Sequence, residues 1–202
     1  MKSFSEIDTV VKRATKGVGF NWGVAEEVGK NIKLLEMFGL PGLKNLNDYK
    51  GEVIEKDIED IFLDKKVVVF AVPGAFFNDN SAKQLQDYEL KYNEIKSLDI
   101  DEVYCISVND DFVMNAWFKN QDIKKVKPIG DGEGVFTHGL DMLVDKPVQG
   151  FGKRSWRYSM LVDDGKIIKQ FVEEGQNNSS SDNDPFEVSD AQTMLDFIKS
   201  NA

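Results

Sequence analysis

Cysteine and histidine are almost missing from this sequence of 202 residues, which contains one of each, Cys105 and His138. A single cysteine excludes a disulfide bond within the chain. Zinc sites built from clusters of cysteine and histidine are excluded by the same count. A serine–histidine–aspartate triad would have to use His138, whose glycine-flanked setting, GEGVFTHGLDM, predicts a short helix or turn with a surface or packing histidine. We therefore expect no bound metal and no cofactor.

Long hydrophobic runs and excess positive charge are also missing. No apolar stretch approaches the roughly 20 residues of a membrane-spanning helix, and the N-terminal MKSFSEIDTVVKRATKG has no signal-peptide core. The net charge of −10 disfavours binding to nucleic acid and to anionic membranes. With 41% hydrophobic and 30% charged residues, the composition is that of a globular protein. We predict a cytoplasmic protein that binds neither nucleic acid nor membrane.

The first 46 residues predict a helical N-terminal extension. Apolar residues recur at helical spacing over 6–16 and again over 23–38, and glycines separate the two segments. Such an amphipathic pair is normally a packing surface, suited to docking or dimerisation. Its sequence RATKGVGFNWGVAEEVGK resembles the opening of a bacterial family of unknown function, and a gene fusion would explain its presence.

Residues 47–202 predict one α/β domain with a mixed sheet. After a linker and a short acidic helix over 47–66, strand and helix patterns alternate, and an Asp-Asp-Gly turn signals a hairpin near the end. The polar stretch 174–185 predicts a surface loop. The predicted strands are 67–72, 102–108, 126–129, 157–162 and 166–172, and the predicted helices are 81–98, 110–121 and 189–198.

Two segments carry a resemblance to a known family, VVVFAVPGAFFNDNS at 67–81 and GFGKRSWRYSM at 150–160. With CISVNDDFVMNAW, DGEGVFTHGLDMLVDK and DPFEVSDAQTMLDFI, they closely resemble the peroxiredoxin-5 group of thiol peroxidases (the redoxin, or AhpC-TSA, family) from about residue 54 to 198. The resemblance implies a thioredoxin-like fold, in which helices flank a mixed central sheet. It also implies a homodimer and a peroxidase that thioredoxin or glutaredoxin reduces.

In that family the PGAF segment is followed by Thr-Pro-x-Cys-Ser, and the cysteine attacks the peroxide. Its thiolate is favoured by the helix N-terminus and by an arginine, and it becomes a sulfenic acid that external thiols reduce. The family's active-site positions are here Pro73, Phe77, Asn80 and Arg157. The proline and the arginine agree with the family, whereas Phe77 replaces its threonine and Asn80 replaces its cysteine.

A carboxamide is not a nucleophile towards peroxide, and phenylalanine cannot hydrogen-bond a peroxide oxygen. The sequence therefore predicts a non-catalytic binding or interaction protein, a pseudoenzyme. Asn80 and Arg157 would form an anion pocket in it, suited to a small anion or a hydroperoxide.

Two alternatives remain at this point. The chain could be a thiol-dependent peroxidase with a relocated or borrowed thiol such as Cys105, although a cysteine in the middle of an apolar strand usually behaves as a small buried hydrophobe. It could also be a different enzyme that uses Asp79, Asn80 and Arg157 for polar catalysis, but nothing in the sequence specifies a substrate.

Overall fold

The structure, a computed structural model, describes residues 3–17, 22–37, 58–147, 150–177 and 184–201. The chain divides into two compact units, Met1–Ile54 and Glu55–Ala202. The predicted boundary between residues 46 and 47 lies outside the described residues and stays a prediction.

In the first unit, the described residues form two helices, α1 (Phe4–Gly17) and α2 (Trp22–Met37). Their contact is apolar: Ile7 and Val11 of α1 are buried together with Ile32 of α2. The helical spacing in the sequence therefore identified both helices, within one or two residues at each end.

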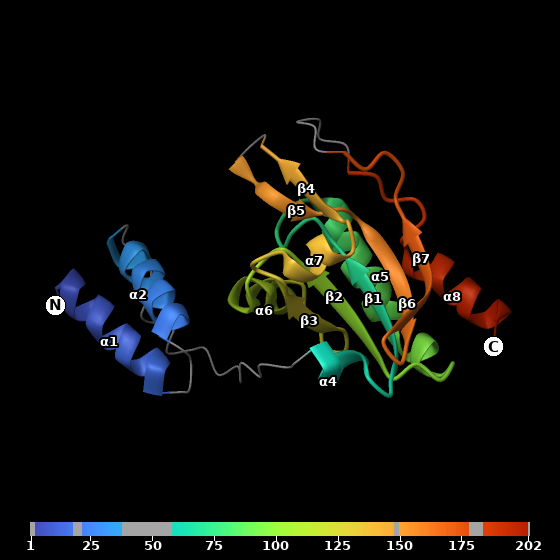
Figure 1. The fold of residues 1–202 in the computed structure, drawn as a ribbon, viewed down its shortest axis with the longest axis horizontal. Coiled ribbons are helices and arrows are strands. Elements are labelled where there is room, and N and C mark those ends of the chain that lie inside the picture. Colours follow the sequence, from blue (N-terminus) through green and yellow to red (C-terminus); the bar gives the residue numbers. More distant parts are fainter. Residues whose placement is uncertain (1–2, 18–21, 38–57, 148–149, 178–183, 202) are drawn as a thin grey trace. The chain divides into compact units, whose positions relative to one another are not determined.

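The second unit is built on a five-stranded mixed sheet (Figure 1). Its order is β3-β2-β1-β6-β7, with β1, β2 and β3 parallel and with β6 and β7 antiparallel to their neighbours. The predicted hairpin of β6 and β7 is confirmed, whereas the separate two-stranded ribbon of β4 and β5 was not predicted. The strands are β1 (Lys66–Ala71), β2 (Glu102–Ser107), β3 (Lys127–Gly130), β4 (Leu143–Lys146), β5 (Gly152–Ser155), β6 (Tyr158–Asp163) and β7 (Lys166–Val172).

Helices cover both faces of this sheet (Figure 1). One face packs against α5 (Asp79–Lys96), α6 (Asp111–Asn120) and α8 (Ala191–Ser200), and the other against α4 (Ile58–Phe62) and α7 (Val135–Gly139). Because side chains alternate along a strand, β1 sends Val68 and Phe70 into the first core and Val67 and Val69 into the second. A strand buried on both faces requires the continuous apolar run that the sequence has here.

Side-chain caps set where the helices begin. Asn78 caps α5 by accepting a hydrogen bond from the Ser81 amide at 3.0 Å, so α5 starts two residues before the predicted position 81. Asp110 caps α6 through the Val113 amide at 2.8 Å. The carboxylate of Asp131 accepts from two amides at the start of α7.

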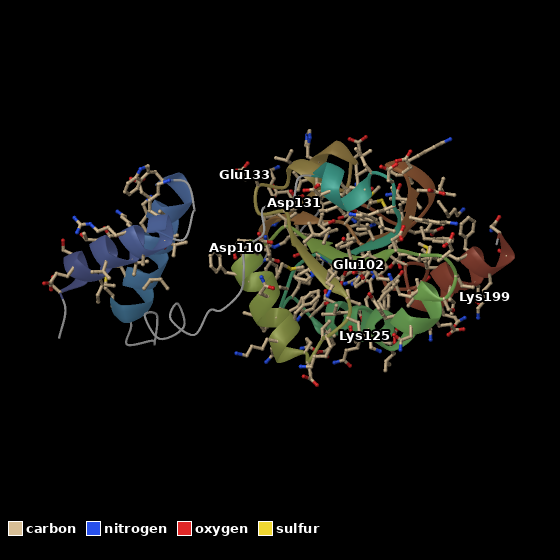
Figure 2. All side chains as sticks on the ribbon, turned by 90° about the horizontal axis from the view of Figure 1, so that it is seen from below. Glu102, Asp110, Lys125, Asp131, Glu133 and Lys199 are labelled. Atoms are coloured by element: carbon tan, nitrogen blue, oxygen red, sulfur yellow. The ribbon has the colours of Figure 1, made fainter. Side chains whose placement is uncertain are left out.

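Asp110 and Asp131 follow the parallel strands β2 and β3, so both lie at the carboxyl end of these strands, as Figure 2 shows.

Among the described helices, none is long and apolar enough to span a membrane.

The packing of this core can be tested at the stacked rings of Phe70 in β1 and Tyr88 in α5. Both rings are fully buried, and their centroids lie 4.0 Å apart at 5° between planes. We expect Phe70→Ala to lower the free energy of unfolding by about 3–5 kcal/mol, because it removes buried apolar surface and leaves a cavity. Leu90→Ala is the control, on the helix α5 that also carries Tyr88; because Leu90 is 79% exposed, we expect a change of about 0.5 kcal/mol or less. Urea denaturation measures both; equal losses would contradict the packing described.

Candidate functional site

The loop after β1 leads into the start of α5. Pro73 and Gly74 are buried, and the amide of Ala75 donates to Oδ1 of Asn109 at 2.9 Å. A Cβ at Gly74 would meet the same Asn109 oxygen at 3.3 Å, a tight contact that a larger residue could make only if the Asn109 side chain shifted. Phe76 has a φ of 56°, an uncommon conformation for a residue other than glycine, and its side chain is exposed.

Phe77 joins the two segments that carry the family resemblance. Its ring packs on that of Phe151 with centroids 4.5 Å apart and an interplanar angle of 43°. Phe151 directly precedes β5, so this contact holds the PGAF loop against the ribbon.

Arg157 lies between β5 and β6 and is completely buried. Its guanidinium donates from Nη1 to Oε1 of Gln84 at 2.7 Å and from Nη2 to Oγ of Ser81 at 3.2 Å. Both partners belong to the first turns of α5, so the positive charge lies beside the start of this helix. Phe186 covers it, with its ring centroid 5.6 Å from the guanidinium carbon.

The anion that faces Arg157 is Asp184 of the same chain. Nε of Arg157 donates to Oδ1 of Asp184 at 3.1 Å, and Nη2 donates to Oδ2, so the two side chains form a bidentate ion pair. Asn78 Nδ2 donates to the same Oδ2 at 2.5 Å, and Asn80 Nδ2 donates to the backbone carbonyl of Asp184 at 3.0 Å. The Asp184 side chain is only 11% exposed.

The predicted site residues Asn80 and Arg157 are thus brought to one place, and both bind the same residue. Asp184 was missed, because it falls in the polar stretch interpreted as surface loop. The available signal was that Asp184 opens DPFEVSDAQTMLDFI, one of the family-like segments.

The segment 184–190 is held in place by a buried carboxylate. Glu173, at 2% exposure, accepts hydrogen bonds of 2.9–3.0 Å from the amides of Glu187, Val188 and Ser189, and one of 2.7 Å from the Ser189 hydroxyl. Gln84 adds a 3.1 Å bond to the Ser189 carbonyl. Asp184 is therefore presented to Arg157 from a segment that is anchored at its other end.

Cys105 lies inside β2, where its Cα pairs with Phe70 of β1 and Pro128 of β3. It is fully buried, as predicted, and burial raises the pKa of its thiol well above the usual value, although the charge of Arg157 acts in the opposite direction. The thiolate that peroxide chemistry needs is therefore disfavoured there. His138 is exposed, and among the described residues no group of three acidic, cysteine or histidine side chains could hold a metal ion.

Known proteins resemble this chain in sequence and in structure. A peroxiredoxin of Synechocystis is 48% identical over 153 residues, which are 76% of this chain and 79% of that protein. Reduced Prx3 from Vibrio vulnificus in complex with hydrogen peroxide has a TM-score of 0.65 at 34% identity, over 72% of this chain and 85% of that one. The antioxidant protein of Plasmodium falciparum, a 1-Cys peroxiredoxin, has a TM-score of 0.69 at 34% identity, over 79% of this chain and 93% of that one. A family model described as "Protein of unknown function (DUF3726)" matches residues 2–104.

The chain belongs to the peroxiredoxin family, and through residues 2–104 it belongs also to the family of unknown function. The mixed sheet and the solved relatives together confirm the predicted thioredoxin-like α/β fold. The second match starts at residue 2 and covers both N-terminal helices, which agrees with the resemblance noted for that segment in the sequence.

The burial of Cys105 predicts an unreactive thiol. We expect the folded protein to react with a thiol reagent such as DTNB at least tenfold more slowly than the same protein in denaturant, because the sulfur is inaccessible and protonated. The measurement is the absorbance of the released thionitrobenzoate over time at pH 8. Rapid stoichiometric labelling of the folded chain would contradict the burial described.

Proposed function

We propose that this chain is a peroxiredoxin-fold protein without the family's peroxidase chemistry, which acts by binding. The observation that carries the proposal is Asn80. It lies in the first turn of α5, where the family pattern has its attacking cysteine. An amide side chain cannot form a sulfenic acid, so the catalytic cycle has no first step here.

The surroundings of Asn80 support binding. Arg157, Asn78 and Asn80 bring hydrogen-bond donors together beside the start of α5, and these donors bind Asp184, an anion of the chain itself. Their affinity for a carboxylate supports the proposal of an anion pocket at Asn80 and Arg157. Phe77 stands in place of the family's threonine, so the hydroxyl that would hold peroxide is missing. Its ring instead packs on the ring of Phe151.

The alternatives have less support. A peroxidase centred on Cys105 would need a buried, protonated thiol to meet peroxide. A different enzyme built on Asp79, Asn80 and Arg157 would need polar groups ready for a substrate, but the donors of Asn80 and Arg157 already bind Asp184. The homodimer, the small-anion or hydroperoxide ligand and the cytoplasmic location stay predictions.

Peroxide consumption is the direct test. We expect the full-length protein with a thiol reductant to consume hydrogen peroxide no faster than reductant alone, and Cys105→Ser to behave in the same way. Loss of peroxide is followed together with intact mass. Consumption by the wild type that disappears in Cys105→Ser would refute the proposal and make Cys105 a relocated nucleophile.

Restoring the family residues tests whether Asn80 is the missing element. We expect Phe77→Thr combined with Asn80→Cys, in a Cys105→Ser background, to gain at least tenfold in thiol-dependent peroxide consumption. The reason is that a thiol at position 80 would lie in the first turn of α5 near Arg157. Phe77→Thr with Cys105→Ser is the matched control, which has no thiol and should stay inactive. A folded but inactive revertant would show that more than position 80 has changed.

A further inference from the structure

Besides Arg157, Asp184 accepts hydrogen bonds from two residues that the family pattern does not provide. Asn78 stands where the pattern has proline, which has no side-chain donor, and Asn80 stands where it has cysteine. Both amides donate to Asp184, one to its carboxylate and the other to its backbone carbonyl. We infer that the Arg157 pocket is a carboxylate-binding site whose resident ligand is the chain's own Asp184, held by Asn78 and Asn80.

Charge supports this assignment. A fully buried guanidinium needs an anion and hydrogen-bond acceptors to offset the loss of its hydration. Arg157 is 0% exposed, and Asp184 is its ion-pair partner, while Gln84 accepts from Nη1 and Ser81 accepts from Nη2. A thiolate at position 80 would be a second anion beside Asp184, whereas the neutral amide of Asn80 adds a donor.

Shape supports it as well. Nε and Nη2 of Arg157 donate to the two oxygens of the Asp184 carboxylate, a planar arrangement that matches a carboxylate. The guanidinium carbon also lies over the ring of Phe186, two residues further along, at 5.6 Å from its centroid. Asp184 and Phe186 thus both contact the Arg157 guanidinium, and both belong to the segment that Glu173 holds in place.

The ligand class follows from these donors. Without the Asp184 side chain, Nε and Nη2 of Arg157 and the side-chain amide of Asn78 would be available to bind a small carboxylate, of which formate and acetate are the simplest. With Asp184 in place, the same ligands are excluded. This inference goes beyond the proposed function and does not depend on it, because it concerns what occupies the pocket and not whether peroxide is reduced.

Chemical rescue tests the inference. We expect Asp184→Ala in the full-length protein to lower the unfolding temperature by about 5 °C, since it leaves Arg157 without its anion. Sodium formate should restore at least half of that loss in a concentration-dependent manner, relative to sodium chloride at the same ionic strength. Wild type should not respond to formate beyond the chloride effect, because its site is occupied. Glu187→Ala is the matched control, as it removes one exposed acidic side chain from the same segment and should also not respond.

An Asp184→Ala response to formate no larger than that of Glu187→Ala would overturn the inference. Since peroxide plays no part in this readout, that failure would leave the proposed lack of peroxidase activity untouched, and discovery of such activity would leave the rescue result standing.

A milder variant decides the matter if Asp184→Ala does not fold. Asn80→Ala removes only the amide that holds the Asp184 carbonyl, so we expect severalfold faster amide hydrogen exchange in peptides covering 185–189. Gln86→Ala is the control, because it removes an exposed amide from the same helix, one that bonds to Gln121. Exchange in 185–189 that is equal in the two variants would contradict the role given to Asn80.

Discussion

The buried charge of Arg157 is the constraint on which the arrangement of this unit depends. A guanidinium without solvent contact is costly unless each side of it is paired, and breaking such a pair typically costs about 3–5 kcal/mol. Here the partners come from two places in the sequence: α5 supplies Ser81 and Gln84, and the segment 184–190 supplies Asp184 together with the ring of Phe186. The arginine therefore fixes the position of both α5 and the segment 184–190 relative to β6.

A second buried charge extends this arrangement to β7 and α8. Glu173 directly follows β7, and its carboxylate binds three successive amides and a hydroxyl of residues 187–189. The next residue, Asp190, caps α8 through the amides of Gln192 and Thr193. Two buried charges of opposite sign, Arg157 and Glu173, thus hold the two ends of one short segment. The segment brings Asp184 to Arg157, which α5 also satisfies, and it brings the amides of 187–189 to Glu173.

The fold was largely predictable because its signals are local. The uninterrupted apolar run at 67–72 identified the central strand, and the Asp-Asp-Gly turn identified the β6–β7 hairpin. The start of α5 was placed late because Asn78 was not recognised as its cap. The pairing of Asp184 with Arg157 could not be predicted, since an aspartate in a polar, serine-rich stretch looks like any solvated carboxylate. Only the folded chain brings it to a buried arginine 27 residues away in sequence.

The same geometry shows why agreement with the family at Pro73 and Arg157 is weak support for catalysis. Pro73 is buried in the loop that leads to α5, and Arg157 carries hydrogen bonds that join α5 to the segment 184–190. Both residues have a structural role that persists whether or not a peroxide is ever bound. Asn80 differs from them: it lies in the first turn of α5, and its side-chain amide donates to the Asp184 carbonyl. A nucleophile at that position could therefore be lost without loss of the fold, because function resides in the site and not in the architecture around it.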